Sequence, residues 1–357
     1  MKVSIIGAGI SGLACAHELE QHGIIPDIYE ERNQVGELFT HVATILQIMN
    51  RPVKDQINEV YQKFNIRLKP YNLLTKIKMH TPKTSGTVYG RLGYLMKQGQ
   101  DQDSTANQLL KQINAPIYYN YCANYTKLAR EYDYVVVANG TSNITKALGC
   151  WQDVFKSWVI GSTVLGSFDP TGMKMWLNTE YAKAGYAYLT PFNQKSASLI
   201  LVVQGANRNN INYYWNKFWE KEKFTYEIVE LWDLEHSSGF VFPHQVDNIL
   251  FVGNSGGFLE PLLGFALLGG IYSGVYAAKS IAEGTNYEDY LAQLKENTRI
   301  SIALRNYLNK YQNENFDHLI ALLTTPIIKN MVYNTNLDII KHVASLVDLI
   351  NKVKSLK

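Results

Sequence analysis

The first thirty residues decide the fold, and they read MKVSIIGAGISGLACAHELEQHGIIPDIYE from Met1 to Glu30. The run Val3–Ile6 has the length and apolar character of a short buried strand, and Leu13–His22 is typical of a helix. A second short apolar run over 24–29 ends in Glu30. Strand, helix and strand in this order predict a βαβ unit.

The turn between the first strand and the helix reads GAGISG, and Glu30 follows its first glycine by 23 residues. Gly7 permits a tight turn, Gly9 lets the backbone approach a pyrophosphate, and Gly12 lets the helix pack closely on the sheet. The free N–H groups of the helix start attract phosphate, while the Glu30 carboxylate would accept hydrogen bonds from a ribose 2′-hydroxyl. The turn therefore predicts a site for FAD or NAD.

Composition limits the class of protein further. The 357 residues are enough for two or three lobes, and 46% of them are apolar while 18% are charged. A net charge of +3, without a basic run, gives no reason to expect a nucleic-acid partner. Cys15, Cys122 and Cys150 have no metal-ligand spacing and no even-numbered disulfide framework, so we expect no metal site and a reduced, cytoplasmic setting.

Two apolar segments raise the question of a membrane. The uncharged run 261–278 has nearly the length of a span, but it begins with proline and is rich in glycine, so we do not expect it to cross a bilayer. Because the nucleotide strand begins at Val3, we expect no cleavable signal. The tail 316–357 has a helical period and ends with several lysines. We expect it to pack on the body, with a membrane-surface helix as the alternative.

The rest of the chain predicts further elements. Helical patterns cover 37–50, 53–64, 103–113, 210–223, 264–283, 287–310 and 316–357, the last broken near Pro326. Strand patterns cover 74–89 as a hairpin, 117–121, 134–138 and 249–252. The run 134–138 fits a parallel strand buried on both faces and leads into Gly140. The aromatic, β-rich segment 151–203 predicts a second lobe with an apolar pocket.

Three motifs in sequence order carry a family resemblance. They are the opening glycine unit with Glu30, the segment YDYVVVANG at 132–140, and FVGNSGGFLEPLLG at 251–264. Together they resemble FAD-dependent enzymes of the aromatic-hydroxylase fold, and within these the geranylgeranyl reductase family. The segment GYAYLTP at 185–191 resembles the aromatic–proline strand of those reductases. The resemblance covers roughly residues 1–283.

The resemblance implies an α/β fold with three parts. A Rossmann-like, three-layer ββα FAD-binding domain would comprise 1–48, 86–148 and 240–285. A substrate domain built on an inserted antiparallel β-sheet would comprise 49–85 and 149–239, and a C-terminal helical region would comprise 286–357.

The resemblance also implies which residues hold FAD. The ADP half of FAD would contact Gly7, Gly9, Ile10, Ser11, Gly12, Glu30 and Glu31, with Ala138, Asn139 and Gly140 at the second crossing. Gly253 and Asn254 would lie along the ribityl chain and pyrophosphate. The isoalloxazine edge would contact Pro261, Gly264, Phe265 and Ala266. Helix N–H groups aimed at flavin N1 and O2 would stabilise the negative charge of reduced flavin. The substrate pocket would include Tyr186, Tyr188 and Pro191.

The chain departs from the family pattern at three points. Asn254 stands where the family usually has Asp, although an Asn side chain can still accept a hydrogen bond from a ribityl hydroxyl. Ala266 stands where the family usually has Gly, which would narrow the approach to the flavin. The Cys-containing loop of the family is not recognisable over 36–44, so the family's substrate does not follow from the resemblance.

Three functions fit these observations. The first is an FAD-dependent reductase that transfers hydride from reduced flavin to a double bond of an apolar, isoprenoid-like small molecule. The second is an NAD(P)H-dependent flavin monooxygenase of an aromatic or apolar substrate, and the third is a non-catalytic flavoprotein that binds a partner. The electron donor would be NAD(P)H or reduced ferredoxin, the latter a protein partner. Catalytic residues stay unknown: His41, Tyr188 and Glu260 are candidates by position, and a structural role is the simpler interpretation of each.

Overall fold

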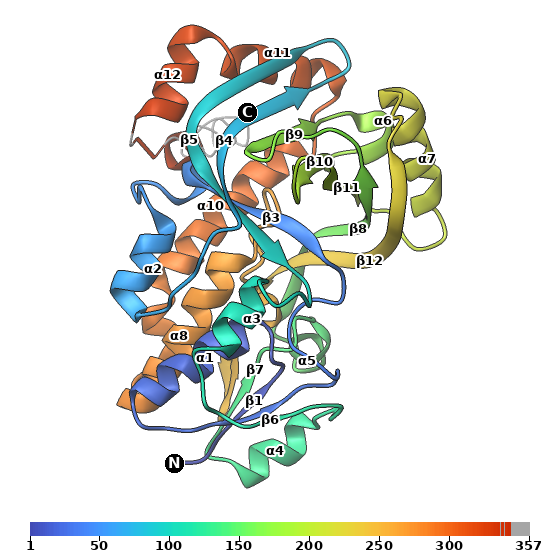
Figure 1. Cartoon of the computed structure of the whole chain (residues 1–357). Helices are drawn as coiled ribbons and strands as arrows, with labels where there is room; N and C mark the ends of the chain where they lie inside the picture. The colour runs from blue at the N-terminus through green and yellow to red at the C-terminus, as the bar shows by residue number, and fades with distance from the viewer. Residues whose placement is uncertain (336, 339, 344–357) are drawn as a thin grey trace.

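The computed structural model describes residues 1–335, 337–338 and 340–343, and it contains two β-sheets joined by helices (Figure 1). A six-stranded sheet lies at the lower end of the view, close to the N-terminus. An eight-stranded sheet lies above it, and the C-terminal helices run along both parts. This is the α/β architecture that the sequence predicts.

The six-stranded sheet is the predicted Rossmann-like sheet. Its strands in spatial order are β13 (Gln245–Val246), β14 (Ile249–Phe251), β7 (Tyr134–Val137), β1 (Val3–Ile6), β2 (Asp27–Tyr29) and β6 (Ile117–Tyr118). All neighbours are parallel except β13 and β14. The prediction that 134–138 forms a buried parallel strand is confirmed, since β7 lies between β1 and β14.

Alternation along these strands produces three layers. Val3, Ile5 and Val136 face one side, where they pack with α1 (Ile10–Gln21) and α8 (Leu267–Glu283). Ile6, Val135, Val137 and Phe251 face the other side, where they pack with α4 (Tyr125–Glu131) and α5 (Asn143–Ala147). Successive strand residues point to opposite faces, so apolar runs of this kind require cover on both.

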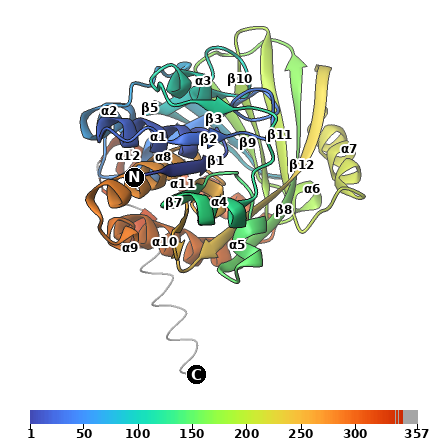
Figure 2. The ribbon, with the colours of Figure 1, turned by 90° about the horizontal axis from the view of Figure 1, so that it is seen from below.

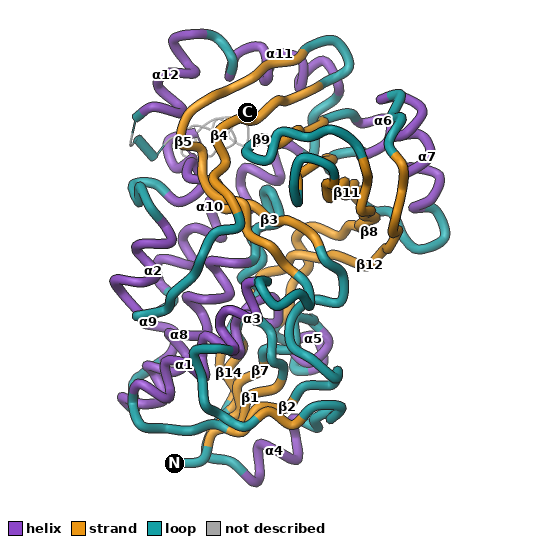
Figure 3. Tube along the Cα trace, in the orientation of Figure 1, coloured by secondary structure: helices purple, strands orange, loops and turns teal. Residues whose placement is uncertain are grey.

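The eight-stranded sheet is the second lobe (Figure 3). In spatial order it contains β12 (Glu227–Val241), β8 (Trp151–Leu165), β11 (Ser196–Gln204), β10 (Tyr186–Pro191), β9 (Gly172–Trp176), β4 (Asn72–His80), β5 (Ser85–Gln98) and β3 (His41–Leu46). Its pairs are antiparallel except β4 and β9, which run parallel. The expected antiparallel sheet is therefore found except at this pair, where strands from two separate segments of the chain meet.

The helix predicted over 37–50 is wrong. Its centre is β3, followed by a 3₁₀ turn over Gln47–Asn50. β3 pairs with β5, so that His41 lies opposite Gln98 and Leu46 opposite Gly93. The β-branched residues of β3 suit such a pairing, which depends on a strand some fifty positions away and leaves no local signal. β3 and β5 thus join the second sheet, although 41–46 and 86–98 fall in ranges assigned to the nucleotide domain. The domain boundaries otherwise stay a prediction.

The remaining helices cover the two sheets. They are α2 (Gln56–Phe64), α3 (Thr105–Leu110), α6 (Thr179–Ala182), α7 (Ile211–Glu222), α9 (Tyr287–Tyr290), α10 (Ala292–Leu308), α11 (Asn313–Leu323) and α12 (Pro326–Asn334). Figure 2 shows α7 on the outer side of the eight-stranded sheet, where Trp215 and Phe218 pack against the sheet residues Leu199 and Leu201. The opposite face packs in part against Ile320 and Leu323 of α11 and in part against Leu263, in the loop before α8.

The C-terminal region differs from its expected pattern in one place and agrees with it in another. The helix expected over 287–310 is divided at Leu291 into α9 and α10. The break predicted near Pro326 is confirmed: Pro326 begins α12 and separates it from α11, because a proline suits the first turn of a helix but not its interior. Residues 344–357, with the apolar positions and lysines that suggested a surface helix, lie outside the described residues. Within the described part of the chain, no helix is both long and apolar enough to cross a membrane.

A half-buried carboxylate, that of Glu288, fastens α9 to the residue before β13. Glu288 accepts hydrogen bonds from the His244 N–H at 2.7 Å and from Lys295 Nζ at 2.9 Å, and its Oε1 lies 3.1 Å from His244 Nδ1. Burial by itself would raise the pKa of Glu288, but these hydrogen bonds outweigh it and lower that pKa to about 2.

We expect Glu288→Gln to destabilise the fold by on the order of 3 kcal/mol at pH 7. A folded-state pKa of about 2 lies below the ordinary 4.5, so this contribution is complete above about pH 4.5 and is lost as the pH falls towards 2. Urea unfolding at several pH values measures the difference. The matched change Glu296→Gln, at an exposed ion pair with Arg299, should have little effect at any pH. A Glu288 difference that does not vary with pH would contradict the assignment.

Candidate functional site

The glycine turn after β1 is shaped by two close backbone approaches. A Cβ atom on Gly7, whose φ is +104°, would lie 2.5 Å from the carbonyl oxygen of Ala138. A Cβ atom on Gly12 would lie 2.1 Å from the carbonyl oxygen of Gly7. At Gly9 the nearest atom would be 4.0 Å away, so this glycine faces open space. The turn thus packs against β7 with two glycines and leaves the third free for a ligand.

The N-terminus of α1 opens onto this turn. Gly9 is its N-cap and offers no side-chain cap, and the first turn contains no acidic residue. The first intrahelical bond runs from the Leu13 N–H to the Gly9 carbonyl at 2.9 Å. The N–H groups of Ile10 and Ser11 precede this bond, and unpaired N–H groups with the positive end of the helix dipole favour an anion. A pyrophosphate is the anion that this geometry suits.

Glu30 ties the end of β2 to the glycine turn. Its side chain is buried, and Oε2 accepts a hydrogen bond from the Ala8 N–H at 2.8 Å. Oε1 accepts from the Arg32 N–H at 3.0 Å and lies 3.3 Å from Arg32 Nε. Each carboxylate oxygen can accept more than one hydrogen bond, so Glu30 retains capacity for a ribose hydroxyl. Glu31 beside it is exposed.

The other two motifs meet the first at the carboxyl edge of the sheet. Asn139 and Gly140 follow β7, and the Ser255 hydroxyl joins them by donating to Asn139 Oδ1 at 2.7 Å and accepting from the Gly140 N–H at 3.1 Å. The 3₁₀ turn Gly253–Gly256 follows β14 and contains Asn254. A Cβ on Gly253 would lie 2.5 Å from Ser11 Oγ. Ligands of open α/β sheets bind at this edge.

The loop from Phe258 to Ala266 leads to a second open helix end. Ala266 is the N-cap of α8 without a side-chain cap, and Gly264 has a left-handed φ of +71°. Glu260 organises the loop, because its carboxyl oxygens accept the Leu262 and Leu263 N–H groups at 2.7 and 2.8 Å. Burial raises the pKa of Glu260. These contacts give Glu260 a structural role in the loop. Pro261 is the residue between Glu260 and Leu262.

The predicted substrate residues differ in their placement. The Tyr186 hydroxyl donates to the Leu263 carbonyl, and the Tyr186 and Tyr188 rings stack at 6.1 Å, so both lie beside the loop. Burial raises the pKa of both tyrosines. Pro191 ends the same strand, β10, at its other end. His41 Nε2 lies 3.5 Å from Glu37 Oε2, and the His41 ring lies 6.1 Å from that of Trp232.

Sequence reasoning missed several residues of this region. Ser255 and Ser273 hold the nucleotide loops through their hydroxyls, the second by accepting the Gly253 N–H at 2.9 Å. The signal for Ser255 was its place inside the third motif. His236 and Ser238, on β12, line a small cavity beneath the loop, and nothing in the local sequence marks them.

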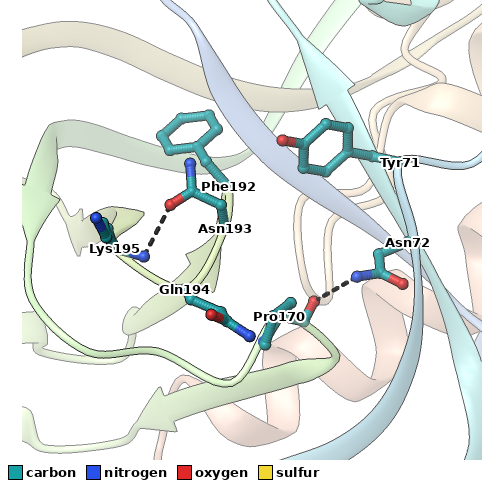
Figure 4. A pocket seen from close by; sticks show the side chains of 7 residues that line it. All are labelled: Tyr71, Asn72, Pro170, Phe192, Asn193, Gln194 and Lys195. Carbon is teal, nitrogen blue, oxygen red and sulfur yellow. Dashed lines mark hydrogen bonds between the residues drawn. The ribbon is translucent and has the colours of Figure 1, made fainter.

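A second, larger hollow lies away from these motifs. Figure 4 shows it at the tip of the β10–β11 hairpin, where its volume is about 570 Å³. It is lined by Tyr71, Asn72, Pro170, Phe192, Asn193, Gln194 and Lys195. The Asn72 side chain donates to the Pro170 carbonyl at 3.0 Å, and Asn193 Oδ1 accepts the Lys195 N–H at 2.8 Å. None of these residues belongs to the three motifs.

Comparison with known proteins agrees with this geometry. Residues 5–48 match the model of a family described as an NAD(P)-binding Rossmann-like domain. No curated protein matches the chain. Among solved structures, a geranylgeranyl bacteriochlorophyll reductase-like protein from Thermoplasma acidophilum aligns with a TM-score of 0.75 and 14% identity, over 97% of this chain and 98% of that one. The chain has the fold of the flavin-dependent oxidoreductases.

Other structures of this fold align over comparable lengths. A triple mutant of a flavin-dependent brominase aligns with a TM-score of 0.68 and 12% identity, over 99% of each chain. A flavoprotein/dehydrogenase from Cytophaga hutchinsonii aligns with a TM-score of 0.63 and 13% identity, over 98% of this chain and 100% of that one. At such identities the comparison establishes the shared flavin-dependent oxidoreductase fold.

The residues present fit FAD. The space beside Gly9 is open to a ligand, and a Cβ atom there would make it smaller. The N-termini of α1 and α8 have no side-chain cap. Ala266 has a φ of −109°, which any residue can adopt, so the backbone does not require the glycine that is usual there. The change from Gly to Ala at this position is therefore compatible with the loop.

The contact between α1 and α8 yields a stability test. A Cβ on Gly274 would lie 2.2 Å from the Ser11 carbonyl oxygen, whereas a Cβ on Gly270, one turn earlier in α8, would have its nearest neighbour at 3.8 Å. We expect Gly274→Ala to destabilise the protein by roughly 1 to 3 kcal/mol, because helix backbones must separate. Gly270→Ala should be neutral or stabilising by about 0.5 kcal/mol, since alanine favours helix. Thermal unfolding measures both, and equal effects would refute the close approach.

Proposed function

We propose that this protein is an FAD-dependent oxidoreductase that reduces a double bond of an apolar, isoprenoid-like substrate. The observation that supports this most is the meeting of three motifs at the carboxyl edge of one parallel sheet, with Glu30 and an open α1 N-terminus beside them. A second open helix end, that of α8, lies behind the loop 258–266. FAD is the dinucleotide whose length and flavin end would use both helix ends.

Each group of residues has a proposed part in binding. The N–H groups of Ile10 and Ser11 would bind the pyrophosphate, and Glu30 would accept the ribose hydroxyls, with Glu31 beside it. Asn254 would accept a ribityl hydroxyl from the turn after β14. The backbone from Gly264 to Ala266 and the start of α8 would face the isoalloxazine edge, where the dipole of the helix stabilises added negative charge. Bound FAD would supply the hydride for the double bond.

The protein's own contribution to the reaction would be orientation and exclusion of water. The inner face of the eight-stranded sheet brings Tyr186, Trp232 and Ile200 into one buried apolar cluster, with Tyr188 and Leu263 packed against it. The Phe39 ring lies parallel to that of Trp232 at 4.9 Å. Such a lining favours an apolar substrate over a charged one. NAD(P)H or reduced ferredoxin would supply the electrons.

A flavin monooxygenase is the second candidate. The observation in its favour is that a mutant of a 2-methyl-3-hydroxypyridine-5-carboxylic acid oxygenase shares the fold, with a TM-score of 0.59 and 13% identity over 93% of this chain and 96% of that one. The monooxygenase would use the same cofactor site and an aromatic substrate. The two candidates differ in whether oxygen is consumed when substrate is added.

An anaerobic absorbance titration tests the proposal. We expect the purified protein, reconstituted with FAD, to show a flavin spectrum. This spectrum is bleached either by NADPH or NADH or, if no nicotinamide is the donor, only by dithionite and reduced ferredoxin. Prompt bleaching by a nicotinamide would identify it as the donor. Substrate-dependent oxygen uptake with a hydroxylated product would favour the monooxygenase. Failure to bind FAD at micromolar concentrations would overturn the proposed function.

A charge-neutral variant tests the nucleotide end. We expect Glu30→Gln to weaken FAD binding by about tenfold or more, because the charge-assisted hydrogen bonds from ribose are worth more than 1 kcal/mol. Glu131→Gln removes the same charge from an exposed ion pair on α4 and should leave the affinity unchanged. Quenching of flavin fluorescence measures both. Equal affinities for the two variants would exclude Glu30 from the site.

A further inference from the structure

A small cavity lies between the eight-stranded sheet and the loop 260–264. Its volume is about 10 Å³, which is space for one water molecule. The sheet side is formed in part by Tyr186 from β10 and by His236 and Ser238 from β12, and the loop side includes Glu260 and Gly264. β10 and β12 are three strands apart in the sheet, yet their polar groups meet those of the loop here. The surrounding side chains are apolar.

Ser238 is the first indication of a ligand. Its side chain is 1% exposed, and its Oγ has no hydrogen-bond partner among the described residues. Leaving a buried hydroxyl unpaired costs about 1 to 3 kcal/mol, so native proteins pair such groups with protein, water or ligand. Because Ser238 lines the cavity, the partner that its hydroxyl needs can be placed there.

The tautomer of His236 is the second indication. The Ser157 hydroxyl donates its single proton to the His236 carbonyl oxygen at 2.6 Å. The same Oγ lies 3.3 Å from His236 Nδ1, and having no further proton it can only accept there. Nδ1 therefore carries the ring proton, and Nε2 has a free lone pair. Burial lowers the pKa of His236 to about 4, which keeps the ring neutral at pH 7.

The His236 ring is directed at the loop. Its Cε1 and Nε2 atoms lie 3.2 and 3.6 Å from the point where a Cβ on Gly264 would be. The Tyr186 hydroxyl lies 3.1 Å from the same point and donates to the Leu263 carbonyl. The missing side chain at Gly264 thus leaves the lone pair of Nε2 facing the space beneath the loop.

The charges around the cavity exclude an anion. None of the described residues that line it is a lysine or an arginine. Arg305 lies nearby, but its guanidinium donates to the carbonyls of Leu262 at 3.2 Å and Ala184 at 2.7 Å. The Glu260 carboxyl group and the Nε2 lone pair would repel a carboxylate or phosphate. A hydroxyl fits, because it can donate its proton to Nε2 and accept the proton of the Ser238 hydroxyl.

We propose that His236 and Ser238 form a hydroxyl-binding subsite, which holds one water in the free protein and the hydroxyl of an apolar alcohol in the complex. The hydroxyl donates its proton to Nε2 and accepts the Ser238 hydroxyl proton. A ligand group that reproduces both hydrogen bonds of the water can replace it without loss. The inference that the ligand is apolar rests on the proposed function, whereas the inference of a water site does not.

The test measures ligand binding to the FAD-loaded, oxidised protein by quenching of tryptophan fluorescence. The probes are farnesol, the hydrocarbon farnesene and farnesoic acid, which share an apolar chain and differ at its end. We expect farnesol to bind about tenfold or more tightly than either, although farnesene is the more hydrophobic. Ser238→Ala should reduce this preference to less than about threefold.

Ser162→Ala is the matched control. Ser162 is equally buried at 1% exposure and its Oγ also has no partner among the described residues, but it lies on β8 and does not line the cavity. It should keep the full preference for farnesol. A crystal structure of the free protein should show one water between Ser238 Oγ and His236 Nε2, and an empty cavity would overturn the inference.

The outcomes separate the subsite from the proposed function. If FAD binds but farnesol shows no preference, or Ser238→Ala retains it, the subsite is refuted and the cofactor assignment stands. If FAD does not bind, the proposed function fails, and the same probes on the FAD-free protein still decide the subsite. Loss of the preference in Ser238→Ala alone supports the subsite in either case.

Discussion

The structure depends on backbone contacts that only glycine permits. Gly7 touches the carbonyl after β7, Gly12 touches the carbonyl of Gly7, and Gly274 brings α8 against the carbonyl of Ser11. Together these approaches hold the start of α1 between two strands and a second helix. A side chain at any one of the three would meet backbone at 2.5 Å or less, which no rotamer change can relieve. The open helix end at Ile10 and Ser11 is the result.

The loop 258–266 joins this nucleotide region to the second lobe. Its conformation is determined by Glu260, whose carboxyl oxygens accept two of the loop's own N–H groups. The loop is held to the sheet by Tyr186 and to α10 by Arg305, which donates to its Leu262 carbonyl. Buried groups of this kind are satisfied only when all their partners are in place. The position of the α8 N-terminus relative to the second sheet therefore follows from contacts of three separate elements.

Local patterns predicted the parts of the fold in which each residue's environment repeats along the chain. The runs at Val3–Ile6, 134–138 and 249–252 were confirmed as strands, because a central parallel strand is apolar on both faces. The pattern at 37–50 failed, since β3 is a strand only by virtue of its pairing with β5. The parallel pairing of β4 with β9 could likewise not be predicted, because the register between distant strands has no local signal in the sequence.

The sequence by itself determined the proposed nucleotide end of this protein. Its glycines, Glu30 and the two later motifs are local features, and their spacing already places them at one edge of a parallel sheet. The tertiary structure alone decided the proposed substrate end. His236 and Ser238 line a common cavity only because β12 folds beneath a loop that begins about twenty residues later, and the Nε2 lone pair is free only because Ser157 occupies Nδ1. The direction of the hydrogen bonds between the adjacent strands β8 and β12 is a property of packing, which spacing along the chain does not encode.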